Sequence, residues 1–146
     1  MNRLASLVIS MAAVLSLCGC GDKLGAGSVN SFVGVYSYRD RCLVTLGSST
    51  EMKSLNGEFK LTKLSDNMVK LSGAWNTIGE VIGNTVSFRD DIQANNDGHM
   101  VYSFGVGTLE GDVLTFDYLG SGSAKNSAGS LIQMTSRGHV VATKKQ

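Results

Sequence analysis

The chain of 146 residues lacks proline altogether, has one tryptophan and two histidines, and carries no marked excess of either charge. Its 13 basic and 12 acidic side chains give a net charge of +1, so the basic surface typical of nucleic-acid binding is absent and we predict no nucleic-acid partner. Without proline, the turns depend on Gly, Asn, Asp and Ser, and 18 glycines are present. Turns of this composition favour β-hairpins.

One long apolar run stands near the start of the chain. Arg3 precedes 14 residues, Leu4 to Leu17, that are interrupted only by serines, which is the pattern of a secretory signal peptide. The run is shorter than the roughly 20 residues that span a bilayer, so a permanent transmembrane helix is the weaker interpretation. We therefore predict that residues 1–19 form a signal peptide.

The segment Leu17-Cys18-Gly19-Cys20 resembles a bacterial lipobox. In that motif a signal peptidase cuts before a cysteine that carries a diacylglyceryl thioether, and a small residue precedes the cut. Cleavage before Cys20 places Gly19 there, whereas cleavage before Cys18 would place the bulky Leu17 there. The resemblance implies that Cys20 is lipidated and that acyl chains anchor the mature protein in the membrane. Gly21, where Asp would signal inner-membrane retention, favours delivery to the outer membrane.

The remaining N-terminal residues and the third cysteine complete the domain organisation. Small and polar side chains dominate residues 20–31, so we predict a lipidated cysteine followed by a flexible tether, and a single domain over residues 32–146. With Cys18 removed and Cys20 acylated, Cys42 has no disulfide partner. We predict a buried, inert thiol in a strand; a redox or intermolecular role is the alternative.

From residue 32 onward the apolar side chains alternate with a period of two, which predicts strands. Leu114, Phe116 and Tyr118 share one face of such a strand, and Met100, Tyr102, Phe104 and Val106 share one face of another. The same alternation predicts roughly eight to ten strands. The candidates are Phe32–Tyr38, Arg41–Leu46, Glu58–Thr62, Val69–Trp75, Ile78–Ile82, Thr85–Phe88, Met100–Val106, Leu114–Tyr118, Leu131–Thr135 and Val140–Thr143.

Turn residues separate these strands and define the expected topology. Asn56-Gly57 is the strongest hairpin signal, because Asn and Gly tolerate the positive φ angles of a type I′ turn. Gly120 to Gly129 is a low-complexity stretch that we expect to be a mobile loop. Further turns are expected at Asp66-Asn67, Gly83-Asn84, Asn96-Asp97-Gly98 and Glu110-Gly111-Asp112. We predict an all-β, antiparallel up-and-down meander that closes into a small barrel of about eight strands, with a β-sandwich as the alternative.

Several segments also carry a family resemblance. They are Gly34-x-Tyr36, Phe59-x-Leu61-x-Lys63, Val69-x-Leu71-x-Gly73, Ile82-Gly83-Asn84-Thr85-Val86 and the run from Gly107 to Phe116. Together with the lipobox, they resemble small bacterial lipoproteins with a lipocalin-like (calycin-type) barrel. Lipocalins carry Gly-x-Trp on the first strand, and Tyr36 stands here in place of that tryptophan. The resemblance implies a binding or inhibitory module.

Residues able to carry out catalysis are few. His99 and His139 lie far apart in the sequence, and neither has a second metal-type ligand at a suitable spacing, so we predict no metal site. The serines of Gly120 to Ser123 do not form a Gly-x-Ser-x-Gly nucleophile motif. Asp90, Asp91, Asn95 and Asp97 form an acidic turn, for which a solvated connection is favoured over calcium binding. We predict a protein that is not an enzyme, with no catalytic residue and no cofactor.

The aromatic residues leave two hypotheses for function. In the first, a small hydrophobic ligand occupies the barrel and contacts Tyr36, Trp75, Tyr102 and Tyr118. In the second, aromatic side chains fill the barrel, and the protein is an interaction module of the envelope, such as an inhibitor of a cell-wall hydrolase or an accessory subunit of an envelope complex. Loops around 90–99 and 120–129 would then form the interaction surface.

Overall fold

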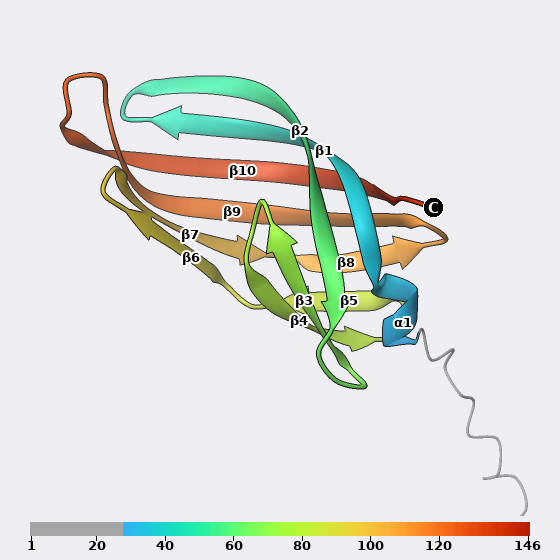
Figure 1. Ribbon diagram of the computed structural model, residues 1–146. Helices are drawn as coiled ribbons and strands as arrows, with labels where there is room; N and C mark the ends of the chain where they lie inside the picture. Colours follow the sequence, from blue (N-terminus) through green and yellow to red (C-terminus); the bar gives the residue numbers. More distant parts are fainter. Residues whose placement is uncertain (1–27) are drawn as a thin grey trace, which may run out of the picture.

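A computed structural model describes residues 28–146, so the predicted signal peptide and Cys20 lie outside the described residues. Within them the chain forms one short helix and ten strands (Figure 1). No helix in this part of the chain is long and apolar enough to cross a bilayer. The elements are α1 (Val29–Phe32), β1 (Gly34–Leu46), β2 (Ser49–Lys63), β3 (Met68–Gly73), β4 (Thr77–Ile82), β5 (Thr85–Phe88), β6 (Asp91–Asn95), β7 (Gly98–Phe104), β8 (Val106–Glu110), β9 (Val113–Lys125) and β10 (Leu131–Lys144).

All strand pairs are antiparallel, and eight of the described strands close a ring in the order β10-β1-β2-β3-β4-β5-β8-β9. Pairing between β9 and β10 completes the closure. The prediction of an all-β meander closing through about eight strands is therefore confirmed. The alternative β-sandwich is not what forms, because a single sheet curls around one core.

Two strands, β6 and β7, lie outside the ring. The pairing of β5 with β8 and the pairing of β6 with β7 continue one register. β5 and β6 therefore act as one long strand with a break, and so do β7 and β8. Against β9, however, the registers of β7 and β8 differ by one residue, because Phe104 lies opposite Tyr118 and Thr108 lies opposite Thr115. Gly105 is the extra residue of a β-bulge, and its N–H donates to the carbonyl of Asp117 at 2.8 Å.

The bulge corrects one prediction about strand faces. A strict alternation from Met100 to Val106 would place all four of its apolar side chains inside. Beyond Gly105 the alternation is reversed, so Val106 is exposed while Phe104 packs against the core. The corresponding prediction for Leu114, Phe116 and Tyr118 is confirmed, since all three are buried.

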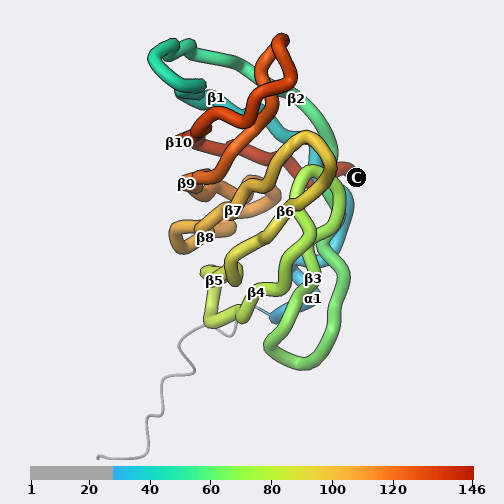
Figure 2. The backbone as a smooth tube through the Cα atoms, turned by 90° about the vertical axis from the view of Figure 1, so that its left-hand side faces the viewer, coloured from blue at the N-terminus to red at the C-terminus, as the bar shows by residue number. Residues whose placement is uncertain are grey.

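The long strands β1, β2, β9 and β10 extend past the ring and, with β6 and β7, form an open, curved sheet (Figure 1). From Ser49 to Glu58, β2 pairs with β1 alone, because β3 pairs with β2 only from Phe59 onward. Seen after a quarter turn, β1, β10, β9 and β7 follow one another down this sheet (Figure 2). The protein therefore has a closed barrel at one end and an open sheet at the other.

The hairpin predicted at Asn56-Gly57 is wrong, because both residues lie within β2. The first hairpin turns instead at Gly47, whose φ of 60° is in the left-handed region. Gly57 is needed for close approach: a Cβ there would lie 2.7 Å from the hydroxyl oxygen of Tyr38. Glycine at this position makes room for an aromatic ring on the neighbouring strand. The four other predicted turns are confirmed.

The loop predicted from Gly120 to Gly129 is also largely wrong. Strand β9 continues to Lys125 and pairs with both β7 and β10. A Cβ at Gly120 would lie 2.9 Å from the ring of Tyr102, so the small residues here accommodate crowded neighbours instead of forming a loop. The segments predicted as Phe32–Tyr38 and Arg41–Leu46 are joined in β1, except that Phe32 belongs to α1 and the strand begins only at Gly34. The last two predicted strands are likewise joined in β10.

Helix α1 packs against the ring at the end opposite the open sheet. Val29 and Phe32 are buried, and the hydroxyl of Tyr36 donates to the carbonyl of Phe32 at 2.9 Å. Among the described residues, packing against the ring therefore includes Val29, which precedes the predicted domain start at Phe32 by three residues.

Candidate functional site

Aromatic rings are packed together inside the ring of strands. Trp75 contacts four of them, with centroid distances of 5.3 Å to Tyr118, 5.7 Å to Phe116 and Tyr38, and 6.0 Å to Phe104. Most of these pairs are tilted or edge-to-face, the geometry that aromatic quadrupoles favour. The centre of the barrel is therefore a packed aromatic core.

The four residues predicted to line a ligand cavity belong to this core. Trp75, Tyr102 and Tyr118 lie together, with Tyr102 and Tyr118 at a centroid distance of 5.8 Å. Tyr36 lies apart from them, near α1, where it stacks on Phe59 at 5.3 Å. Tyr36 is 0% exposed and Trp75 is 5% exposed. Ligand binding by these side chains remains a prediction, and their packing does not favour it.

A buried polar pair lies at the edge of the aromatic core. The hydroxyl of Tyr118 donates to one carboxyl oxygen of Asp40 at 2.7 Å, across β9 and β1. Asp40 is 1% exposed, and its other oxygen has no hydrogen-bond partner. The hydroxyl of Ser136 is likewise buried without a partner. Cys42 follows on the same inward face and is buried, as predicted; it is the one cysteine of the described residues.

Burial changes the titration of this group of side chains. Removal from water raises the pKa of Asp40, and the hydrogen bond from Tyr118 opposes that rise only in part. Burial, followed by the nearby carboxyl of Asp40, raises the pKa of Cys42. A thiol held in its neutral form is a poor nucleophile. Outside this group, near α1, burial raises the pKa of Tyr36 to about 12.

The acidic turn and the two histidines are placed separately. The buried carboxylate of Asp91 accepts from the backbone N–H of Asn76 at 3.1 Å and from the amide of Gln93 at 2.8 Å. His99 meets Ser123, and His139 meets Asp117. Among the described residues, no group of three or more His, Cys, Asp or Glu is arranged to hold a metal ion.

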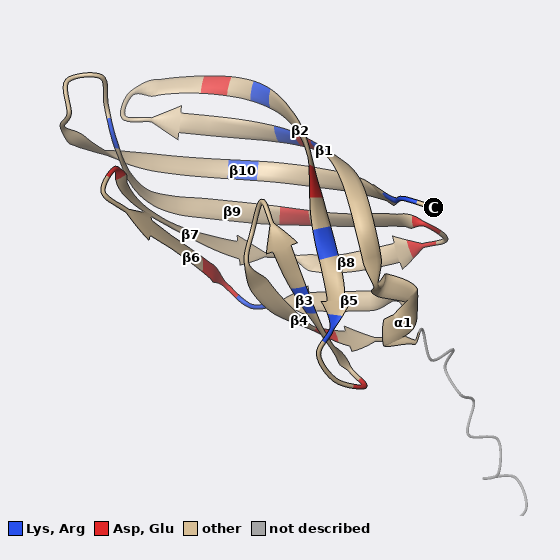
Figure 3. Cartoon of the chain, in the orientation of Figure 1, with Lys and Arg blue, Asp and Glu red and all other residues tan. Residues whose placement is uncertain are grey.

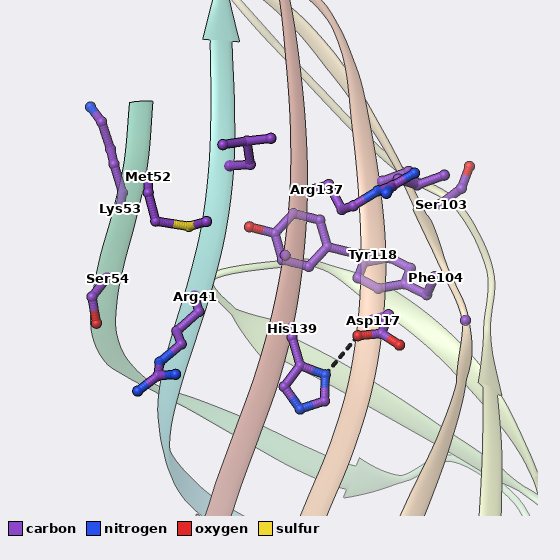
Figure 4. A pocket seen from close by; sticks show the side chains of 14 residues that line it. Arg41, Met52, Lys53, Ser54, Ser103, Phe104, Asp117, Tyr118, Arg137 and His139 are labelled. Carbon is purple, nitrogen blue, oxygen red and sulfur yellow. Dashed lines mark hydrogen bonds and ion pairs between the residues drawn. The ribbon is translucent and has the colours of Figure 1, made fainter. Parts of the chain in front are cut away.

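A groove of about 1090 Å³ lies on the outer face of the open sheet, across β2, β1, β10, β9 and β7 (Figure 4). Arg41 and Leu43 line it; they alternate along β1 with the buried Asp40 and Cys42, so they point away from the core. A smaller groove of about 530 Å³ adjoins it over Thr45 and neighbouring hydroxyl side chains. We call the larger one the outer groove.

Strand register builds the floor of the outer groove from two rows that cross the strands. Neighbouring side chains in a row come from strands about 4.8 Å apart. The first row is Ser54, Arg41, His139 and Asp117; the second is Met52, Leu43, Arg137, Leu119 and Ser103. At the β7 end the bulge places Gly105, which has no side chain, beside the groove. The second row therefore has an arginine between two leucines.

Basic residues outnumber acidic ones in the lining of the outer groove, with Arg41, Lys53 and Arg137 against the single acidic Asp117. Figure 3 shows basic positions on β1, β2 and β10 and an acidic position on β9. Five ion pairs form among the described residues, and none includes an arginine, so Arg41 and Arg137 have no acidic partner there. The single acidic residue of the groove, Asp117, is paired with His139 at 2.6 Å. Lys53, at the rim, pairs with Glu51 at 3.5 Å. Two guanidinium groups thus remain available for a ligand.

Comparison with known proteins adds no relative: no family model matches the chain, and neither does any characterised protein. The lipocalin-like resemblance therefore remains a prediction.

Sequence reasoning missed the outer groove, although one signal was present. Arg41 and Leu43 occupy the polar face of one strand, and Arg137 and His139 occupy that of another. Their proximity depends on the pairing of β1 with β10, which no local pattern in the sequence reveals.

Proposed function

We propose that this protein is a membrane-anchored lipoprotein of the bacterial envelope, carried on the outer membrane by acyl chains on Cys20. Its role is non-enzymatic: the barrel is a scaffold that binds an envelope protein through its outer surface. The observation that carries this proposal is the contrast between a core filled with aromatic rings and an open, cationic groove outside it. A carrier of hydrophobic ligands needs an enclosed cavity instead.

The short distance from the proposed anchor to the barrel supports binding of a partner at the open sheet. Ser28 lies eight positions after Cys20, and eight steps of a fully extended chain reach about 30 Å at most. The end of the barrel at α1 would therefore stay near the membrane. The open sheet lies at the opposite end, where it is available to a partner in the surrounding compartment (Figure 1).

Native mass spectrometry of the full chain in a neutral detergent tests the filled core. The wild type should show only the mass of the acylated polypeptide, even with added indole. Trp75→Ala is the positive control, because removal of the buried indole should open an apolar cavity that takes indole from solution. A hydrophobic molecule retained by the wild type would instead support the first hypothesis, a ligand inside the barrel.

Membrane anchoring is tested separately. Cys20→Ala should appear in the soluble fraction or as an unprocessed precursor, because no thiol would be left for acylation at that site. Cys42→Ala is the matched control and should fractionate with the membrane like the wild type. Unchanged fractionation of the Cys20 variant would contradict the anchor.

A further inference from the structure

We propose that the outer groove binds an extended acidic segment of the partner protein, in which a carboxylate side chain is flanked two residues away on each side by apolar side chains. This inference rests on the proposed function, because it specifies the chemistry of the partner. The arrangement that supports it is the second cross-strand row, in which Arg137 stands between Leu43 on β1 and Leu119 on β9.

Charge complementarity identifies the sign of the occupant. Arg41 and Arg137 lie on adjacent strands as diagonal neighbours, and neither pairs with an acidic residue of the described chain. A planar guanidinium binds a carboxylate through two parallel hydrogen bonds. The partner segment therefore needs at least one carboxylate, for Arg137, and a second acidic residue would complement Arg41.

The apolar side chains indicate the rest of the segment. Leu43, Leu119 and Met52 are 41%, 54% and 68% exposed, which is unusually high for neighbouring side chains on one sheet face. In an extended segment, residues i−2, i and i+2 point to one side and stand about 6.6 Å apart. With its carboxylate at Arg137, a Leu-x-Glu-x-Leu pattern laid along the row places one leucine between Leu43 and Met52 and the other just beyond Leu119.

The openness of the outer groove favours a protein segment over a lipid. An acyl chain gains affinity by enclosure, and binding pockets bury most of the surface of a small ligand. The outer groove is instead open along the sheet, and hydroxyl side chains in the adjoining smaller groove offer hydrogen bonds to a peptide backbone. An anionic lipid headgroup could meet the same arginines, so the experiment includes it.

The test measures binding of fluorescein-labelled peptides to the full chain in a neutral detergent by anisotropy. The probe peptide has the sequence Ser-Leu-Ser-Glu-Ser-Leu-Ser. A first control peptide replaces Glu by Gln, and a second moves Glu by one position so that it faces away from the leucines. We expect the probe to bind at least about tenfold more tightly than either control, since a charged hydrogen bond is lost in both.

Variants of the protein locate the binding. Arg137→Gln should weaken binding of the probe at least about tenfold, and Arg137→Lys should weaken it less, because the charge remains without the bidentate geometry. Arg89→Gln, which removes the same charge outside the outer groove, should leave binding unchanged. Asp117→Asn should strengthen binding, because it removes the only acidic side chain of the groove; a purely structural role for Asp117 would not produce that gain.

Three outcomes would overturn the proposal. These are absence of probe binding at millimolar concentration, binding that Arg137→Gln leaves intact, or binding of phosphatidylglycerol vesicles that depends on Arg137 while the peptide does not bind. In each case a ligand-free core in native mass spectrometry would still support a protein-binding scaffold. Failure of the outer groove is therefore distinguishable from failure of the proposed function.

Discussion

Replacement of Gly138 by alanine tests whether the barrel core is filled. Gly138 lies on β10 opposite Tyr118, and a Cβ there would overlap the ring of Tyr118 and lie 2.6 Å from the free carboxyl oxygen of Asp40. The ring cannot simply turn aside, because it packs on Trp75 and its hydroxyl is bonded to Asp40. One added methyl group therefore forces a rearrangement of the core.

The expected loss of stability in Gly138→Ala follows from the cost of overpacking. Extra methyl groups in a filled core destabilise proteins by about 1–3 kcal/mol. The matched control is Gly105→Ala, because no neighbouring atom lies closer than 3.6 Å to a Cβ at Gly105 and its φ is not positive. Where the backbone is compatible, alanine stabilises by about 0.4–1 kcal/mol through the unfolded state. The free energies of unfolding of the two variants should therefore differ by about 1.4–4 kcal/mol.

Equilibrium unfolding in urea, followed by fluorescence, measures this difference. The protein has a single tryptophan, Trp75, which lies 5.3 Å from the ring of Tyr118, so the signal reports directly on the affected region. Each 1 kcal/mol should also lower the melting temperature by about 3–6 °C in a domain of this size. Equal stability of Gly138→Ala and Gly105→Ala would mean that free space exists beside Tyr118. The barrel would then not be filled, and the main reason to prefer an external binding surface would be lost.

Other predictions concern the buried polar group. Tyr118→Phe should lower the free energy of unfolding by about 1–3 kcal/mol, because the Asp40 carboxyl would lose its partner; an unchanged urea midpoint would contradict that hydrogen bond. Burial raises the pKa of Asp40, so the folded state favours the neutral carboxyl, and stability from this group is lost as the pH rises through the raised pKa. The stability of Asp40→Asn relative to the wild type should therefore increase as the pH rises above about 4, as measured by urea unfolding at each pH; a constant difference would refute the pKa shift. The buried thiol of Cys42 should react with Ellman's reagent only in urea, and rapid reaction of the native protein would show that it is accessible.

The alternation of side chains in the sequence predicted much of the fold. Leu114, Phe116 and Tyr118 are buried as expected, because a strand inside a regular ladder keeps its period of two. The prediction failed at Val106, where a bulge one residue earlier reverses the faces. A bulge depends on the register of three strands, so local periodicity does not reveal it.

Glycine caused the other errors. Asn56-Gly57 and the run from Gly120 have compositions typical of turns, yet both are strand segments in which a missing Cβ admits a neighbouring side chain. Glycine permits either a positive φ or a close approach, and only the tertiary structure shows which property is used. The aromatic residues could be predicted to lie inside from their alternation along each strand. The outer groove could not be predicted, because it depends on which strands pair.

Closure of the ring has a consequence for the biogenesis of the protein. β1 pairs on one side with β10, the last strand of the chain, so Tyr36 pairs with Lys144. Pairing between such distant parts of a chain is slow, because most of the chain must be confined before these contacts form. The barrel therefore cannot be completed while β10 is still being synthesised. If residues 1–19 are the signal peptide proposed above, a nascent chain that remains open in this way would be compatible with threading through a narrow secretion channel, with ring closure on the far side.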